Sequence, residues 1–145
     1  MLYLDTSAFL KLYVREDGSD LVQKLISAQS DPLPVWEILE MELYNALQLK
    51  VFWKELSLDE ATRQQSLFQQ RKIKGMYYVP EIARAEWMAD FRKLAAFTPE
   101  LGCRTLDIIH VAFACQLKPS GFLSFDAKQM KLAKAVGLPV IESLS

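Results

Sequence analysis

The order of apolar and polar residues along the chain predicts short strands that alternate with helices. Two apolar runs, Leu2-Tyr3-Leu4 and Phe122-Leu123-Ser124-Phe125, have the length of buried strands, and an aspartate and a helical pattern follow each of them. The second of these helices covers residues 127–136 and ends before Gly137, a residue type that favours a left-handed cap. This repeat of strand and helix predicts a wound α/β unit.

The middle of the chain continues the alternation. Ser57 and Glu60 have the spacing of a capping box before a polar helix that extends to about Lys74, where Gly75 stops it. The other predicted elements are a strand after Asp31-Pro32, a helix over residues 35–50, a strand at 76–79, helices at 82–97 and 105–117, and a short edge strand at 138–141. A chain of 145 residues without repeats predicts a single domain, residues 1–145.

Four acidic residues interrupt this pattern where apolar residues or turns are expected. Asp5 and Asp126 come at the carboxyl ends of two predicted strands, where ligand sites form in open α/β sheets. Glu42 falls on the apolar side of the helix over residues 35–50, and Asp107 begins an almost wholly apolar helix. Because an unpaired buried carboxylate is costly, these acids need a partner, a metal ion or water.

Each acid also has an ordinary structural interpretation. Asp5 and Asp126 could be N-caps, Asp107 could interact with the helix dipole, and Glu42 could form a salt bridge or reach solvent. Convergence of all four at one end of one sheet favours a single site. Clustered carboxylates bind hard cations such as Mg²⁺ or Mn²⁺, which activate water and polarise a phosphoryl oxygen. The sequence therefore indicates metal-assisted phosphodiester hydrolysis, which needs no His or Cys ligand.

The order and spacing of longer motifs add a family resemblance that covers nearly the whole chain. These motifs are Tyr3-Leu4-Asp5-Thr6-Ser7-Ala8, Glu42-Leu43 with Asn45-Ala46-Leu47, Arg104-Thr105-Leu106-Asp107-Ile108-Ile109-His110-Val111-Ala112, and Ser124-Phe125-Asp126 followed by Gln129, Leu132-Ala133 and Gly137-Leu138. Together they resemble the PIN-domain nucleases, and within them the VapC-type toxins of toxin–antitoxin pairs. The resemblance implies a three-layer α/β/α domain with a mostly parallel central sheet, and cleavage of RNA with Mg²⁺ or Mn²⁺.

The resemblance also implies roles for individual residues and for partners. The family's acidic quartet, which binds metal and is catalytic, matches Asp5, Glu42, Asp107 and Asp126. Its hydroxyl position beside the first acid matches Thr6 or Ser7, and Ser124 is expected to act similarly, because such donors orient a carboxylate or a metal-bound water. The expected partners are RNA, a second copy of the chain in a homodimer, and a cognate antitoxin that blocks the acidic pocket.

The net charge of the chain restricts how such a protein could bind RNA. The net charge is −1 and the pI is about 5.9, which argues against a broad basic surface for nucleic acid. Affinity must then be local, and four cations lie near the predicted site in sequence. The candidates for phosphate binding are Lys11, Arg15, Arg104 and Lys128. The alternative is that these side chains belong to solvated helix surface.

Four other residues raise separate questions. Trp36 stands where many PIN relatives carry a small hydroxyl residue, so it could narrow the pocket, stack on a base, or belong to the core. His110 lies one turn after Asp107 and could be a ligand or general base, although a hydrogen-bonded core histidine is favoured. Cys103 and Cys115 lack partners with the spacing of a zinc site or a disulfide framework, so reduced core thiols are expected.

Apolar residues exceed what one small core obviously needs, and they either form a partner surface or fill the core. They are Phe9, Leu12, Tyr13, Val14, Phe52 and Trp53. The chain has no apolar run near the ~18 residues that span a membrane and no secretory signal pattern, so a cytoplasmic protein is expected.

Two other classes of protein remain as alternatives. One is a PIN-like module that has lost catalysis and acts as a protein-binding scaffold. The other is a phosphoacceptor receiver domain, which also clusters acids at strand ends. A receiver domain predicts a lysine at the end of the last main strand, where this chain has Ser124-Phe125-Asp126.

Overall fold

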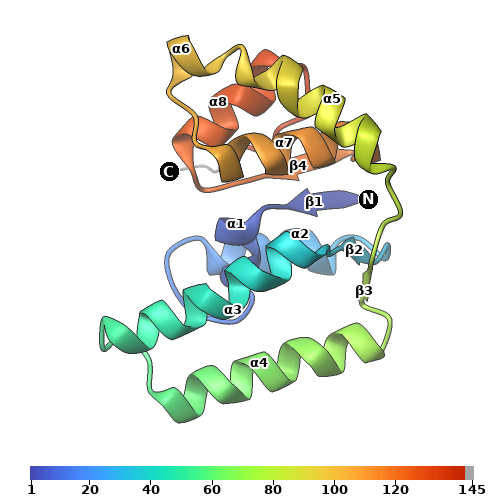
Figure 1. Cartoon of the computed structure of the whole chain (residues 1–145). Helices are drawn as coiled ribbons and strands as arrows, with labels where there is room; N and C mark the ends of the chain where they lie inside the picture. The colour runs from blue at the N-terminus through green and yellow to red at the C-terminus, as the bar shows by residue number, and fades with distance from the viewer. Residues whose placement is uncertain (143–145) are drawn as a thin grey trace.

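The computed structural model describes residues 1–142 and places short parallel strands between two groups of helices (Figure 1). Strand β1 (Leu2–Leu4) pairs in parallel with β4 (Gly121–Leu123), and β2 (Leu33–Pro34) pairs in parallel with β3 (Tyr77–Tyr78). Strand β1 also packs beside β2. The predicted α/β fold with parallel strands is confirmed, although the strands form two hydrogen-bonded pairs instead of one continuous ladder.

The helices lie on both sides of these strands. In Figure 1, α5 to α8 lie on one side of β1 and β4, and α1 to α4 lie on the other. Helix α7 packs against both α5 and α8, and α3 packs against both α1 and α4. The helices are α1 (Thr6–Leu10), α2 (Ser19–Ser27), α3 (Glu37–Phe52), α4 (Leu58–Ile73), α5 (Arg84–Ala95), α6 (Thr98–Leu101), α7 (Thr105–Leu117) and α8 (Ala127–Ala135).

Local signals in the sequence set many of these boundaries. Ser57 caps α4 by accepting a hydrogen bond from the Glu60 backbone N–H at 3.1 Å, as the capping-box spacing predicts. Helix α3 begins two residues later than predicted because Trp36 is extended and forms its N-cap. Of the predicted edge strand at 138–141, the structure keeps one parallel bridge between Phe122 and Val140. Helices α2 and α6 were not predicted.

Some of the apolar residues that could form a partner surface lie in the core, and others are exposed. Phe9 and Tyr13 are core residues, at 0% and 5% exposure, so the partner-surface interpretation is wrong for both. Phe52 and Trp53 are exposed at 78% and 55%, at the end of α3. Apolar surface for a partner therefore remains at this end of the α3–α4 pair. Among residues 1–142, no helix has the length and apolar composition needed to cross a membrane.

Glu16 joins the end of the α1 region to α3. Its two carboxylate oxygens lie 3.0 Å from Lys11 Nζ and 3.1 Å from Lys50 Nζ. Burial raises the pKa of Glu16, but the hydrogen bonds and charges of the two lysines outweigh it, so the pKa is lowered overall. A lowered pKa contributes stability above the unfolded value of about 4.3, and this contribution is lost as the pH falls through the folded pKa.

Glu16→Gln is therefore expected to destabilise the fold by about 1 kcal/mol at pH 7 and by less at an acidic pH, because wild-type Glu16 becomes protonated as the pH falls through its lowered pKa. Urea unfolding at the two pH values measures this difference. Asp20→Asn is the control, because the Asp20 carboxylate and its partner Arg15 are mostly exposed, and a change within about 0.5 kcal/mol is expected. Equal losses for Glu16→Gln at both pH values would show that the lysine pairing is not responsible.

Candidate functional site

All four predicted acids line one pocket of about 590 Å³. Asp5 follows β1 and Asp126 follows β4, while Glu42 lies in α3 and Asp107 in the first turn of α7. The parallel pairing of β1 with β4 brings two of the strand ends together, and the packing of α3 and α7 brings the other two acids to the same place. The structure therefore gathers four acids that are separated by up to 121 positions in the sequence.

Asp5 is buried and held by three donors. Its Oδ1 accepts hydrogen bonds from Ser7 Oγ at 2.7 Å and from the Ala8 backbone N–H at 2.9 Å, and its Oδ2 accepts one from Ser124 Oγ at 2.6 Å. Burial raises the pKa of Asp5, and these hydrogen bonds oppose the rise. Asp5 is thus both the N-cap of α1 and a member of the acidic pocket.

Two serine hydroxyls connect the ends of β1 and β4. Ser124 Oγ donates to Asp5 and accepts a hydrogen bond from the Asp126 backbone N–H at 3.0 Å. Ser7 Oγ donates to Asp5 and accepts one from the Phe125 backbone N–H at 2.9 Å. Both serines are thereby fixed as donors to the first acid, which is the arrangement that an orienting residue requires.

The other three acids have one oxygen engaged by the protein. Asp107 Oδ2 accepts from the Arg104 backbone N–H at 2.9 Å, and Asp126 Oδ1 caps α8. Glu42 Oε1 accepts from Thr6 Oγ1 at 3.0 Å and lies 2.6 Å from His110 Nε2. Within residues 1–142, the second oxygen of each of these acids makes no hydrogen bond to the protein, so it is free to bind a ligand.

The structure brings one of the four candidate cations to this pocket. Arg104 is exposed at the pocket wall. Lys11 is paired with Glu16, and Arg15 is paired with another surface carboxylate. Lys128 is exposed but does not line the pocket. Arg104 is therefore the candidate for phosphate contact that the geometry favours.

Two residues at this pocket were missed or only partly understood from the sequence. His110 is buried and hydrogen-bonded, as favoured, but it also lines the pocket and contacts Glu42. Gln129 was noted only as part of a motif, yet its side chain is buried and lines the pocket. Helical spacing carried a signal for both, because each lies three residues after an acid of the quartet.

Trp36 and the cysteines lie outside the pocket. Trp36 is a core residue whose ring stacks on Phe113, with centroids 3.8 Å apart and planes 8° apart, so it neither narrows the acidic pocket nor offers a platform within it. Cys103 and Cys115 are free thiols, as expected, and burial raises the pKa of both.

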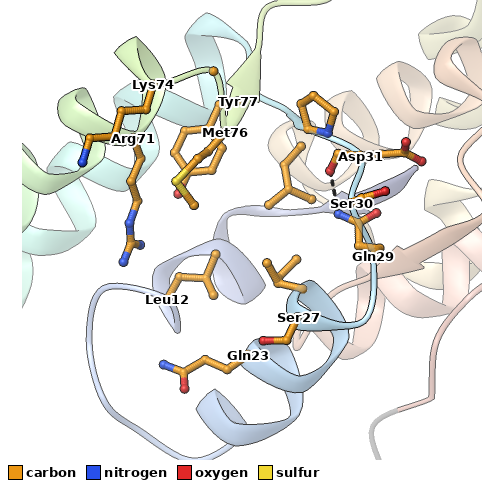
Figure 2. Close-up of a pocket in the computed structure, with 14 residues that line it drawn as sticks. Leu12, Gln23, Ser27, Gln29, Ser30, Asp31, Arg71, Lys74, Met76 and Tyr77 are labelled. Carbon is orange, nitrogen blue, oxygen red and sulfur yellow. Dashed lines mark hydrogen bonds between the residues drawn. The ribbon is translucent and has the colours of Figure 1, made fainter.

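A second pocket, of about 490 Å³, differs in its chemistry (Figure 2). Asp31 is the one carboxylate residue on its wall, and the Gln29 amide donates to the Asp31 backbone carbonyl at 2.9 Å. The cations Arg71 and Lys74 lie on the opposite side of the hollow, and Arg71 also packs over the Tyr13 ring. This pocket has no group of acids, so the acidic pocket is the candidate for metal-dependent chemistry.

Comparison with known proteins agrees with the fold. The family model described as PIN domain matches residues 2–135. The chain belongs to the PIN-domain family. No curated protein matches the sequence.

Two solved structures share this fold over nearly the whole chain. The Mycobacterium tuberculosis protein VapC20, described as a Sarcin-Ricin loop cleaving toxin, aligns with a TM-score of 0.68 and 12% identity, covering 95% of this chain and 96% of its own. FitAcB from Neisseria gonorrhoeae aligns with a TM-score of 0.66 and 15% identity, covering 98% of this chain and 97% of its own. At such low identity the likeness establishes the fold.

The residues of this PIN domain fit a hard divalent cation in donor type. Carboxylate and amide oxygens are the ligands that Mg²⁺ and Mn²⁺ prefer. Among the residues that the structure describes, the buried amide oxygen of Gln129 has no hydrogen-bond partner, which is costly unless a ligand satisfies it. Within residues 1–142, no three His, Cys, Asp or Glu side chains lie close enough together to share one ion.

Gln129→Met is expected to raise the stability of this PIN domain by about 1 kcal/mol without added metal, because it removes an unpaired buried oxygen at nearly constant volume. The same change is expected to weaken Mn²⁺ binding. Thermal unfolding with a chelator and with Mn²⁺ measures both effects. Gln116→Met is the control, since the Gln116 amide donates to Asp90 and its loss should destabilise the fold. Lower stability of Gln129→Met in chelator would mean that the oxygen is satisfied.

Proposed function

We propose that this PIN-domain protein is a metal-dependent endoribonuclease that hydrolyses RNA phosphodiester bonds. The observation that carries the proposal is the convergence of Asp5, Glu42, Asp107 and Asp126 on one pocket. We assign metal binding and catalysis to these four residues, with Mg²⁺ or Mn²⁺ as the cofactor. The description of the structurally similar VapC20 as a toxin that cleaves the Sarcin-Ricin loop supports RNA as the substrate class.

Several residues of the chain orient the acids in the proposed reaction. Ser7 and Ser124 hold the buried carboxylate of Asp5, and the Thr6 hydroxyl donates to Glu42. Backbone N–H groups at the N-termini of α7 and α8 orient the two remaining acids, each of which keeps one oxygen for the ion. When bound there, a divalent cation would lower the pKa of the attacking water and neutralise negative charge on the phosphate.

Substrate contact outside the acids is assigned to Arg104. Its side chain is exposed on the wall of the acidic pocket, where a guanidinium binds phosphate oxygens through paired N–H donors. We give lower weight to Lys11 and Arg15, whose charges are matched by neighbouring carboxylates, and to Lys128. A net charge of −1 agrees with this local mode of RNA binding.

We further propose that the protein is the toxin of a type II toxin–antitoxin pair, that it acts in the cytoplasm as a homodimer, and that a cognate antitoxin protein inhibits it. Its structural similarity to VapC20 and FitAcB supports this cellular role. The exposed side chains of Phe52 and Trp53 offer apolar surface that a protein partner would cover.

Incubation of the purified protein with a mixed cellular RNA pool tests the proposed activity. Cleavage is expected with Mg²⁺ or Mn²⁺ and is expected to stop with a chelator. Asp126→Asn and Asp107→Asn serve as inactive variants, because asparagine is as good an N-cap as aspartate and the first change should leave α8 intact. Cleavage that survives the chelator and both variants would contradict the proposal. Intact RNA together with no Mn²⁺ binding would favour a non-catalytic scaffold.

A further inference from the structure

We propose that Trp36, Tyr3 and His110 form a one-way chain of hydrogen bonds that positions Glu42 for metal binding. The inference rests on the proposed function insofar as Glu42 is a metal ligand. The chain itself is a property of the folded protein. Tyr3 and Trp36 do not line the acidic pocket, so they are positioning residues that act through His110.

The atoms of the chain lie in sequence from the core to the pocket. Trp36 Nε1 is 3.2 Å from the Tyr3 hydroxyl oxygen, which is 2.8 Å from His110 Nδ1. His110 Nε2 is in turn 2.6 Å from Glu42 Oε1. Tyr3, Trp36 and His110 are all buried, and sequence separations of 33, 107 and 68 residues divide the successive partners.

The chemistry of the donors gives the chain its direction. An indole N–H can only donate, so the Tyr3 oxygen accepts from Trp36. Within residues 1–142, the side-chain acceptor available to the Tyr3 hydroxyl proton is His110 Nδ1. Nδ1 therefore carries no proton, and the single proton of a neutral imidazole lies on Nε2, where it is donated to Glu42.

Burial and packing hold the middle of the chain in place. Tyr3 is fully buried, and its hydroxyl keeps its proton at neutral pH as a tyrosine ordinarily does. Aromatic packing fixes the rings: Trp36 stacks on Phe113, and its ring meets that of His110 edge-on at 6.2 Å. A tyrosine or histidine ring in this setting has little freedom to turn away.

The result is a carboxylate with one oriented oxygen and one free oxygen. Glu42 Oε1 receives donors from His110 and from Thr6, whose Oγ1 lies 3.0 Å away. Oε2 is then left for a cation. Trp36 also forms the N-cap of α3, the helix that carries Glu42 two turns further on, so one residue positions both the helix and the hydrogen-bond chain. Partners that orient a ligand in this way typically change metal affinity by about 10-fold to 100-fold when removed.

The single histidine of the chain makes a direct test possible. A long-range ¹H–¹⁵N NMR spectrum of the imidazole at pH 7 without added metal reports His110 alone. The expected signature is a neutral ring protonated on Nε2. Tyr3→Phe removes the donor to Nδ1 while keeping the ring, so the variant is expected to lose the pure Nε2 tautomer. Its Mn²⁺ affinity is expected to fall about 10-fold.

Tyr77→Phe is the matched control. Tyr77 is also buried, and its hydroxyl is hydrogen-bonded to Tyr13, away from His110. Both variants lose one buried hydroxyl, so a merely structural effect would lower stability in both. We expect the His110 spectrum and the Mn²⁺ affinity to change in Tyr3→Phe only.

The outcomes separate this inference from the proposed function. A ring protonated on Nδ1, or a doubly protonated ring, in the wild-type protein at pH 7 would overturn the chain whether or not RNA is cleaved. A spectrum and an affinity in Tyr3→Phe that match those of Tyr77→Phe would overturn it as well. If the Nε2 tautomer is found but the wild-type protein binds no Mn²⁺, the positioning of Glu42 for metal is contradicted together with the proposed function.

Discussion

Asp5→Asn is expected to lower RNA cleavage by at least about 100-fold while leaving the fold intact. Asp5 is the most enclosed acid of the pocket, at 2% exposure, and three hydrogen bonds aim its carboxylate. A bound metal ion contributes several kcal/mol to transition-state stabilisation, and each 1.36 kcal/mol corresponds to a factor of ten in rate. Removing one negative charge from the ligand set is expected to forfeit a large part of that contribution.

The same change is not expected to lower the stability of the fold. Asparagine keeps an oxygen that accepts from Ser7 and from the Ala8 backbone N–H, so the change gives up only the hydrogen bond from Ser124. Burial raises the pKa of Asp5, which means that the pocket disfavours its charged form. A neutral side chain removes that cost, so the free energy of unfolding at pH 7 should be equal or higher.

Cleavage rates and urea unfolding of the same preparations measure both effects. Asp59→Asn is the matched control, because Asp59 is exposed in the first turn of α4 and does not line the acidic pocket. It is expected to retain the wild-type rate. A cleavage rate of Asp5→Asn within a few-fold of wild type would remove Asp5 from the proposed catalytic set. Loss of the folded structure would show that the charge, in addition to the hydrogen bonds, is required at this position.

Phe68→Ala is expected to destabilise the protein by about 3 to 5 kcal/mol, the range for large-to-small changes of buried aromatic residues. Phe68 has 0% exposure, and its ring contacts those of Phe9, Tyr13 and Tyr77 at centroid distances of 6.1, 5.9 and 5.5 Å. Helix α4 is polar apart from a few positions, and Ala61 is its other fully buried residue. The attachment of α4 to the domain therefore depends largely on this ring.

Thermal and urea unfolding measure this loss, and the midpoint temperature is expected to fall by roughly 10 °C or more. Ile73→Ala on the same helix is the control, because Ile73 is 85% exposed and its removal should change stability by no more than about 0.5 kcal/mol. A loss below about 1 kcal/mol for Phe68→Ala would mean that α4 contributes little to the cooperative unit. A loss of helical signal confined to α4 would show that this helix unfolds separately.

Much of the fold could be predicted because its determinants are local. The apolar run of residues 105–117 predicted α7 with its observed bounds, and the capping spacing of Ser57 predicted the start of α4. Helix α2 was not predicted: its N-cap, Gly18, has no side chain to form the capping hydrogen bond that marks the start of α4. The edge strand at 138–141 was predicted from apolar composition, yet Pro139 has no N–H to extend a ladder beyond the single bridge.

The candidate site, like the fold, could be predicted only in part. The sequence by itself determined which four acids are candidates for the site, because a charged residue on an apolar helix face or at a strand end departs from the local pattern of apolar residues. The sequence also suggested the hydroxyl donors Thr6, Ser7 and Ser124, but only the tertiary structure decided which acid each one contacts and which further residues contact the acids. Lys11 forms an ion pair with Glu16 next to α1, and His110 contacts Glu42, which lies 68 positions away in the sequence. Trp36 is linked to Glu42 by the hydrogen bonds of Tyr3 and His110. Such hydrogen bonds depend on where packed helices and strands place each atom, and no periodicity in the sequence records that information.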